Sequence, residues 1–348
     1  MPSKKQHQER QENISEILKY FRKNGSVTRK QISYDLSLSW GCVSELVAML
    51  LSKNILVEAA PCEHKNRGRW PAFLQLNPEI HFLGVDINRN GLKGCICNLL
   101  GEKGAKFSGE LRYDSKNRLI ESVVEFVNTI IKQHKNINGI GFAMQGILNL
   151  QNNIWEFPAE KSISIAFDKD FAERFDVPVV VEHDPNCILY GCVDTNEKNC
   201  MVVRLDRGIG AAIYKDNTFL KKDLLEIGYL VVDENGTRLH DIVSVNTIEK
   251  TLGGNIRPEY CGEETERCFH NIGKYLGIAL GNICNFIHLD EIFLCGDLIL
   301  HYSLFSEAMM KSYKMTVLTE QAAKISAIRI TNAAFGAAKM AMDRFVGD

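Results

Sequence analysis

The sequence predicts an α/β protein with a small winged helix-turn-helix module at residues 1–78 and a two-lobed α/β body behind it. Two short helical patterns joined by a tight turn lie within residues 26–54, and alternating strand and helix patterns begin near residue 80. Residues 1–75 hold twelve Lys and Arg against seven Asp and Glu, a net charge of +5, whereas the whole chain carries −2 and the remainder −7. A basic end on an acidic body is typical of a nucleic-acid-binding module attached to another domain.

The first module should contain three helices. Ser26 or Thr28 can cap the first short helix of the pair, and Ser37 or Ser39 can cap the second. The second short helix carries apolar residues at i, i+3, i+4, i+7 and i+8, which are Val43, Leu46, Val47, Leu50 and Leu51. A preceding helix adds the apolar face Ile14, Ile17, Leu18 and Phe21, after a polar start expected to fray. The alternative to a DNA-binding module is an ordinary helical hairpin.

The second short helix is predicted to enter the major groove, where the first residues of such a helix contact base edges. The residues expected to contact DNA are Ser39, Trp40, Cys42 and Ser44 at bases, and Arg29 and Lys30 at phosphates. Apolar runs at 55–59 and 72–76 then flank a basic loop, the pattern of a β-hairpin wing. Arg67 and Arg69 at its tip are expected in the narrow minor groove, where arginine is favoured. Exposed wings are often charged, so these two arginines alone are weak evidence.

Length and composition exclude some classes of protein. The chain has 348 residues, of which 45% are hydrophobic, and no apolar run reaches the ~18 residues that a membrane span requires. With no export signal at the start, we expect a cytoplasmic protein. The eleven cysteines are scattered, without a CxxC, and so are expected to be reduced thiols rather than metal ligands.

The body reads as two similar α/β halves. The first half is expected to contain strands at 81–87, 92–100 and 101–113, a helix at 119–131, a strand at 137–144, a helix at 165–175 and a strand at 177–181. The second half is expected to contain a strand–glycine turn–strand at 200–217, a helix at 264–286, a strand at 291–294 and a terminal helix at 332–346. Two such halves suggest lobes around a cleft, at 79–195 and 196–331, with residues 332–348 packing back onto the first lobe.

Seven sequence blocks of the body resemble those of the ROK family, in the same order. They are GVDI, GIGFAMQG, PVVVEHDPN, RGIGAAIY, LEIGYLVVDENG, FLCGDLI and FGAA. That family contains sugar kinases of the actin-like ATPase fold and bacterial repressors with a winged helix-turn-helix before the same scaffold. The resemblance extends over essentially the whole chain. It implies an actin-like ATPase fold, and either a kinase or a regulator.

The turns that hold the nucleotide in the family's kinases are altered here. Their first turn resembles Asp-x-Gly-Gly-Thr, whereas residues 86–90 keep Asp86 but neither the glycines nor the threonine. Their second turn resembles Gly-Thr-Gly-Ile-Gly, and Asp206 replaces its first glycine, where a carboxylate would repel a phosphate by roughly 1–4 kcal/mol. The late glycine pair is Gly296-Asp297. These departures predict that the protein is not an enzyme.

The sugar side is better preserved. The kinases resemble Glu-Asn-Asp-Ala-Asn, in which the Asp is the general base, and residues 182–186 here are EHDPN. The resemblance therefore makes Asp184 a vestigial base. It predicts a sugar-binding set of His183, Asp184, Glu226, Tyr229 and Asp241. Alternatively Asp184 only caps the helix that starts at Pro185, and both roles are compatible.

The family's zinc site has no equivalent in the sequence. The family often has a His and three Cys in one loop, but the loop here, NGTRLHDIV, has no cysteine, and His240 alone cannot form a tetrahedral site. We therefore expect no metal and no cofactor. Trp155 and Phe157 either compensate by stacking on a sugar or are buried core aromatics.

The expected function is a DNA-binding transcriptional regulator, a repressor of carbohydrate-metabolism genes that responds to a sugar-type ligand. Its expected partners are double-stranded operator DNA, a small sugar or sugar derivative, and further copies of itself in a homodimer or tetramer, with no membrane. One alternative is a ROK sugar kinase, an ATP-dependent hexose kinase with an appended DNA-binding domain. Two others are a DNA binder without a ligand and a regulator worked by a protein partner.

Overall fold

The computed structural model describes residues 4–59, 72–149, 154–159, 162–192, 198–216, 218–220, 225–253, 262–329 and 333–347. The chain divides into two compact units, Met1–Glu182 with Ala337–Asp348, and His183–Gly336. This division groups the first module with the first lobe and assigns residues 183–195 to the second unit, so the predicted three-part boundaries stay a prediction. Within the described part of the chain, no helix is both long and apolar enough to cross a membrane.

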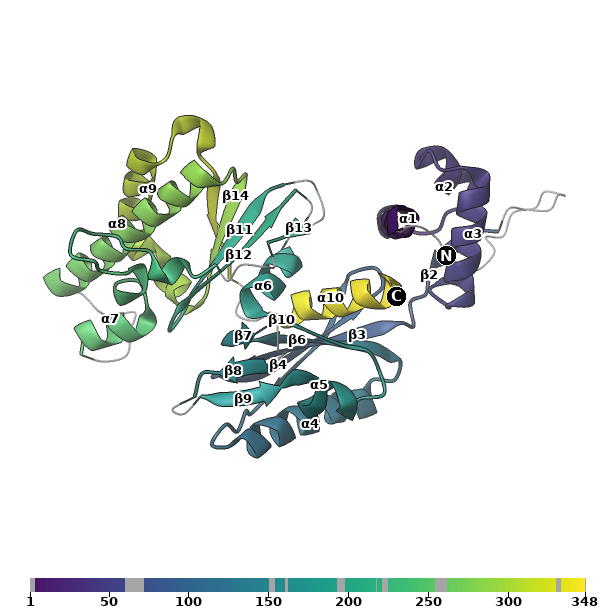
Figure 1. Ribbon diagram of the computed structural model, residues 1–348, viewed down its shortest axis with the longest axis horizontal. Helices are drawn as coiled ribbons and strands as arrows, with labels where there is room; N and C mark the ends of the chain where they lie inside the picture. The colour runs from purple at the N-terminus through teal and green to yellow at the C-terminus, as the bar shows by residue number, and fades with distance from the viewer. Residues whose placement is uncertain are drawn as a thin grey trace. The chain divides into compact units, whose positions relative to one another are not determined.

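The N-terminal module has the predicted helix-turn-helix and hairpin strands (Figure 1). Its elements are α1 (Lys4–Asn24), α2 (Arg29–Asp35), α3 (Trp40–Ser52), β1 (Leu56–Glu58) and β2 (Leu74–Leu76). The two strands pair antiparallel, with Leu56 opposite Leu76. The polar start was expected to fray, which stays a prediction; from Lys4 onward it belongs to α1. Its first turns consist largely of Lys, Gln, Glu and Arg, which favour helix, and the buried stripe further along anchors them.

The short helices start at two of the predicted caps. Thr28 Oγ1 accepts from the Gln31 amide at 3.3 Å, and Gln31 Oε1 accepts from the Thr28 amide at 2.8 Å, which forms a capping box. Ser39 Oγ accepts from the Cys42 amide at 3.2 Å. The apolar faces of the three helices meet in a core in which Ile17, Phe21, Ile32, Val43, Val47 and Leu50 are fully buried.

A five-stranded sheet forms the centre of the first lobe, in the order β10-β6-β3-β4-β5. Its strands are β3 (His81–Asn88), β4 (Gly91–Asn98), β5 (Lys103–Gly109), β6 (Ile137–Met144) and β10 (Val179–His183). Helices α4 (Lys116–Gln133) and α10 (Ala334–Gly347) lie on opposite faces of this sheet (Figure 1). On the α10 side the approach is close, because a Cβ on Gly141 would overlap the carbonyl oxygen of Ala337.

The predicted helix at 165–175 is confirmed only in part. A three-stranded sheet of β7 (Ile147–Asn149), β8 (Ile154–Phe157) and β9 (Ile163–Ala166) extends into it, and only α5 (Phe167–Asp170) and the 3₁₀ turn η1 (Ala172–Arg174) follow. Ile163 and Ile165 alternate toward the core and pair with β8, so strand pairing includes the first two residues of the predicted helix. The aromatics keep their helical spacing, since the Phe171 amide donates to the Phe167 carbonyl oxygen at 2.9 Å. Trp155 and Phe157 are fully buried, which confirms that they are core aromatics.

The second unit contains another five-stranded sheet, ordered β13-β12-β11-β14-β15. Its strands are β11 (Cys200–Leu205), β12 (Ile209–Lys215), β13 (Thr218–Phe219), β14 (Glu291–Cys295) and β15 (Lys324–Ala327). Its helices are α6 (Asp184–Cys192), α7 (Val245–Thr251), α8 (Glu263–Phe286) and α9 (Tyr302–Thr316), with short 3₁₀ turns η2 (Ile227–Tyr229), η3 (Leu239–Asp241), η4 (Asp297–His301) and η5 (Thr319–Gln321). The positions predicted for the helix at 264–286 and the strand at 291–294 are confirmed within one residue.

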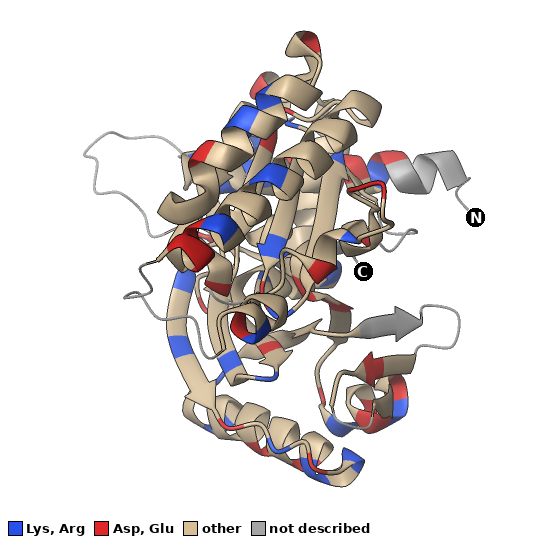
Figure 2. Ribbon diagram, turned by 90° about the vertical axis from the view of Figure 1, so that its left-hand side faces the viewer, with Lys and Arg blue, Asp and Glu red and all other residues tan. Residues whose placement is uncertain are grey.

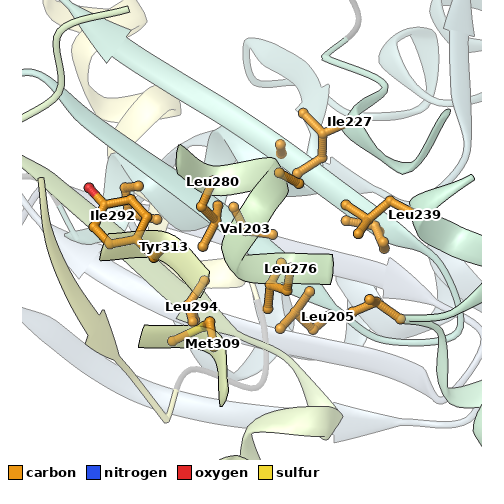
Figure 3. Packing of buried hydrophobic residues seen from close by; sticks show 14 of the residues in the cluster. Val203, Leu205, Ile227, Leu239, Leu276, Leu280, Ile292, Leu294, Met309 and Tyr313 are labelled. Atoms are coloured by element: carbon orange, nitrogen blue, oxygen red, sulfur yellow. The ribbon is translucent and has the colours of Figure 1, made fainter. Parts of the chain in front are cut away.

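The core of the second unit joins the sheet to α8 and α9. Figure 3 shows Leu276 and Leu280 of α8 directed toward Val203 and Leu294 of the sheet. These side chains are fully buried. The packing holds the carboxyl ends of β11 and β14 next to one another, because the two strands run parallel in register, with Arg204 opposite Cys295.

Candidate DNA-binding and ligand-binding sites

The start of α3 is exposed in the helix-turn-helix. The Trp40 side chain is 59% exposed, and Ser44 is half-buried one turn later. Ser39 Oγ is occupied as the helix cap, and Cys42 Sγ accepts from Asn13 Nδ2 of α1 at 3.8 Å, so it faces the module rather than solvent. Of the four residues predicted to contact bases, Trp40 and Ser44 are thus best placed to do so.

The predicted phosphate contacts lie in different parts of the structure. Arg29 and Lys30 form the first turn of α2, where Arg29 is half-buried and Lys30 is exposed. Arg67 and Arg69 fall outside the described residues, so their place in a wing stays a prediction. The helical pattern of α3 did not single out Glu45, whose side chain is 66% exposed and ion-paired with Arg10. Glu45 lies four residues after Gly41 and so on the same face of α3, and this spacing is a signal that could have indicated Glu45.

A buried arginine occupies the centre of the candidate ligand site in the second unit. Arg204, on β11, donates through Nη1 to Asp184 Oδ2 and through Nε to Asp206 Oδ2, the latter at 2.5 Å. Arg204 is 8% exposed and Asp184 is 4% exposed. Sequence reasoning missed Arg204, although one charged residue in the apolar run MVVRL is a signal of an internal partner.

Asp206 is bonded on both carboxylate oxygens. Its Oδ1 accepts from the backbone amide of Asp297 at 2.6 Å, while its Oδ2 accepts from Arg204. Burial raises the pKa of the Asp297 carboxyl, and the neighbouring charge of Asp206 raises it further. The two turns that resemble nucleotide-facing turns of the kinases are therefore joined by one carboxylate.

The turn after β3 is also bonded within its own unit. Asp86 is fully buried, and Asn88 Nδ2 donates to its Oδ2 at 3.1 Å. The Arg89 amide donates to Gln145 Oε1 at 3.3 Å, and its Nε donates to the carbonyl oxygen of Pro158. This turn carries side chains at the positions where the turn of the family's kinases has glycines.

His183 and Asp184 lie at the junction of β10 and α6. His183 Nε2 is 3.6 Å from Asp184 Oδ1, and α6 begins at Asp184 itself, so Asp184 stands in the first turn of this helix. Close packing fixes that helix end, because a Cβ on Gly210 of β12 would lie 2.9 Å from Pro185 Cγ. Asp184 therefore has a structural place at the packed start of α6, where it also forms the ion pair with Arg204.

The other predicted ligand residues form a second group around η2 and η3. The Tyr229 and His240 ring centroids are 5.1 Å apart, and the Arg238 guanidinium carbon lies 5.0 Å from the Tyr229 centroid. Asp241 Oδ2 accepts from the Arg238 amide at 3.0 Å. Glu226 is exposed at the start of η2. Tyr229 is 57% exposed, but these neighbours already contact its ring.

Strand β12 lies between the two groups. A Cβ on Gly228 of η2 would be 3.6 Å from Ile209 Cβ, and the next residue of β12, Gly210, faces Pro185. The structure therefore brings Tyr229 and Asp241 together, and His183 and Asp184 together, on elements that share β12 as a neighbour.

The residues of the shortened loop do not fit a structural zinc ion. His240 Nδ1 is 2.9 Å from the Gly228 carbonyl oxygen, and its Nε2 is 3.1 Å from Asp241 Oδ1, so both ring nitrogens have protein partners. Among the described residues, no group of three or more His, Cys, Asp or Glu is placed to hold a metal ion. A zinc ion bound through thiolates and imidazoles would need such a group. That the protein needs no cofactor stays a prediction.

The first unit contains an open pocket of ≈ 1090 Å³ beside the β3–β4 turn. Arg89, Arg112 and Lys116 line it, but Arg112 pairs with Glu125 at 2.8 Å and Lys116 with Asp170 at 2.7 Å. Further lining residues include Tyr113, Ser115, Ser162, Ser164 and the ion pair Arg118–Asp114. Since most of its charges are paired, this pocket suits an uncharged polar ligand better than an anion.

These features define a class of protein: a helix-turn-helix module joined to a two-lobed α/β body. Residues 82–238 match the ROK family model, and this part of the chain is a ROK family domain.

The similarity to known proteins extends beyond that domain. The chain is 23% identical over 334 residues to the xylose repressor of Bacillus subtilis (strain 168), and this match covers 87% of each of the two chains. A solved ROK family transcriptional regulator, a homologue of the E. coli Mlc protein, matches with a TM-score of 0.79 at 18% identity, over 97% of this chain and 96% of that one. A ROK family glucokinase from Streptomyces griseus, solved with glucose and AMPPNP, matches with a TM-score of 0.61 at 15% identity, over 75% of this chain and 99% of the kinase. The regulator thus shares the fold of nearly the whole chain, and the kinase that of three quarters of it.

Proposed function

We propose that this protein is a DNA-binding transcriptional repressor of carbohydrate-metabolism genes that responds to a sugar-type ligand. The observation that carries the proposal is one chain holding both a capped helix-turn-helix, with Trp40 exposed at the start of α3, and a sugar-kinase-like body. The similarity to a xylose repressor over 87% of each chain supports it, because the match includes more than the body.

We further propose that the body does not transfer phosphate. In a kinase the general base must reach the sugar hydroxyl, and the nucleotide turns must admit phosphate oxygens. Here one oxygen of Asp184 accepts a hydrogen bond from Arg204. Asp206 places a carboxylate at the position where the kinase turn has its first glycine. Both features oppose catalysis, since they occupy the base and repel a phosphate anion.

The ligand we propose is a small neutral sugar, with xylose as the first probe because the relative described above is named a xylose repressor. The contacts would come from His183, Asp184, Glu226, Tyr229 and Asp241. Carboxylates and an imidazole can bond sugar hydroxyls, and the exposed part of Tyr229 can contact a sugar face. The sugar would act by population shift, which requires different affinities for the DNA-binding and the released state.

The proposed form on DNA is a homodimer or tetramer on a roughly palindromic operator, in the cytoplasm. A helix-turn-helix module covers one half-site, and two-fold symmetry places the second half-site one helical turn or a multiple away. This geometry predicts an inverted repeat in the bound sequence.

Selection of bound duplexes from a random library with the full-length protein tests the proposal. We expect an inverted-repeat motif, and release from that motif when xylose or another sugar from a neutral pentose and hexose panel is added. A protein that selects a motif but ignores every sugar would be a ligand-independent binder or one worked by a protein partner. A protein that selects no motif would refute the DNA-binding function itself.

The second candidate is a sugar kinase with an appended DNA-binding module. The retained Asp184 and the shared fold with a glucokinase favour it. An ATP-coupled assay over the same sugars decides between the two, with Asp184→Asn as the matched variant. Turnover that Asp184→Asn abolishes would establish the kinase, whereas no turnover by the native protein supports the regulator.

A further inference from the structure

One stripe of α3 combines two small residues with a single long acidic one. Gly41, Glu45 and Ala48 stand at i, i+4 and i+7, and all three are exposed. Residues at this spacing share a helix face. The small neighbours leave the Glu45 carboxylate as the group that projects furthest from this stripe, and a helix with small residues on one face can lie close to the floor of a groove.

Arg10 of α1 holds that carboxylate. Arg10 Nη1 lies 2.9 Å from Glu45 Oε1, with side-chain exposures of 43% and 66%, and Arg10 Nη2 is 3.5 Å from Met49 Sδ. Two contacts, to residues four apart on α3, place the guanidinium along this helix. Figure 2 shows that the described part of the N-terminal helix carries both acidic and basic residues.

The charge of α3 makes Glu45 unusual for a helix that meets DNA. Residues 40–52 contain no Lys or Arg, and Glu45 is their one charged residue. An acidic side chain is repelled by phosphates, so at this position it weakens non-specific binding unless a base edge or a cation compensates. Arg10 is that cation in the free protein. In the major groove, a carboxylate can accept a hydrogen bond from the amino group of cytosine.

We propose that Glu45 is a specificity-determining residue that accepts from the N4 amino group of a cytosine in each half-site, and that Arg10 positions its carboxylate. This inference rests on the proposed DNA-binding function. One carboxylate oxygen pairs with Arg10 and the other remains available to the base, so the pair reads a C·G position without adding net charge to the interface.

Random-library selection with the native full-length chain and with Glu45→Gln tests the inference. The native protein should select one C·G pair at the same place in both half-sites. Glu45→Gln should reduce the discrimination at that pair by about tenfold and shift it toward adenine, which an amide can contact through N6 and N7, with the rest of the motif unchanged. The matched control is Glu16→Gln, which removes the same charge from an exposed site on α1.

Three results would overturn the inference, each in a different way. An unchanged motif for Glu45→Gln would mean that Glu45 only pairs with Arg10. A uniform rise in affinity for all duplexes, unrelated DNA included, would mean that Glu45 only repels phosphates. If Arg10→Met leaves discrimination at the C·G pair unchanged, Arg10 does not position the carboxylate. A native protein that selects no motif would instead refute the proposed function.

Discussion

Arg204 of β11 donates to Asp184 at the start of α6, and the same guanidinium also bonds Asp206. One buried cation thus joins the start of α6 to the turn between β11 and β12. A buried charge is tolerated only when it is paired and hydrogen-bonded, and here two carboxylates satisfy the arginine. The cluster gives a physical reason why the residue corresponding to a kinase base would serve structure in this chain.

Removal of Arg204 should be strongly destabilising. Arg204→Met leaves Asp184, which is 4% exposed, without its guanidinium partner, and breaking a buried pair in this way costs about 3 kcal/mol or more. Urea unfolding followed by the circular dichroism of the full chain measures the loss. The control is Arg207→Met, because Arg207 is exposed and bonds Asn246 at 3.0 Å, and it should cost under about 1 kcal/mol. Equal losses in the two variants would show that the buried cluster contributes nothing particular.

The charge on Asp297 should lower stability at neutral pH. Its folded-state pKa is raised above the ordinary 3.8, so the folded state binds this proton more tightly than the unfolded chain does. The resulting stabilisation is present below the ordinary pKa and is lost as the pH rises through the raised value. Asp297→Asn should therefore raise the melting temperature at pH 7 and lose that advantage near pH 3. The backbone amide that bonds Asp206 is retained in this variant. The control variant is Asp168→Asn, at an exposed site.

Ser39 should act through its cap and not through a base. Ser39→Ala removes the acceptor for the Cys42 amide and should cost about 1 kcal/mol of local stability at the start of α3. Ser39→Asn supplies another good cap and should restore it. Native-state hydrogen exchange of the Cys42 amide reports the local effect, and operator affinity should follow the same order. If Ser39→Asn binds DNA as weakly as Ser39→Ala does, the hydroxyl has a role beyond capping.

Gly141 should be intolerant of a side chain. A Cβ there would overlap the carbonyl oxygen of Ala337 on α10, so Gly141→Ala must push the helix from the sheet, at about 1–3 kcal/mol. The matched variant is Gly208→Ala, since a Cβ at Gly208 would meet no heavy atom within 4 Å. Thermal unfolding of both variants distinguishes packing from a general effect of replacing glycine. Similar melting temperatures for the two would contradict the close approach of α10.

Much of the fold followed from local pattern. The apolar stripes located α1 and α3, the continuous apolar run located β6 at residues 137–144, and strands β1 and β2 pair as the sequence indicated. The helix predicted at 165–175 was too long, because Ile165 and Ala166 pair with β8 and helical backbone begins only at Phe167. A short segment whose apolar residues fit both the strand and the helix period adopts the structure that its neighbours in the fold favour.

The sequence by itself determined the order of a helix-turn-helix, two α/β lobes and a terminal helix, together with the altered residues of the phosphate turns. Only the tertiary structure decided that Arg204 bonds Asp184 and Asp206, that Ser39 and Thr28 are the caps, and that Arg10 holds Glu45. Periodicity reports which face of an element is apolar, because burial acts along each element separately. An ion pair between α1 and α3, or between β11 and α6, depends on which elements become neighbours in space, and that information is spread over the whole chain.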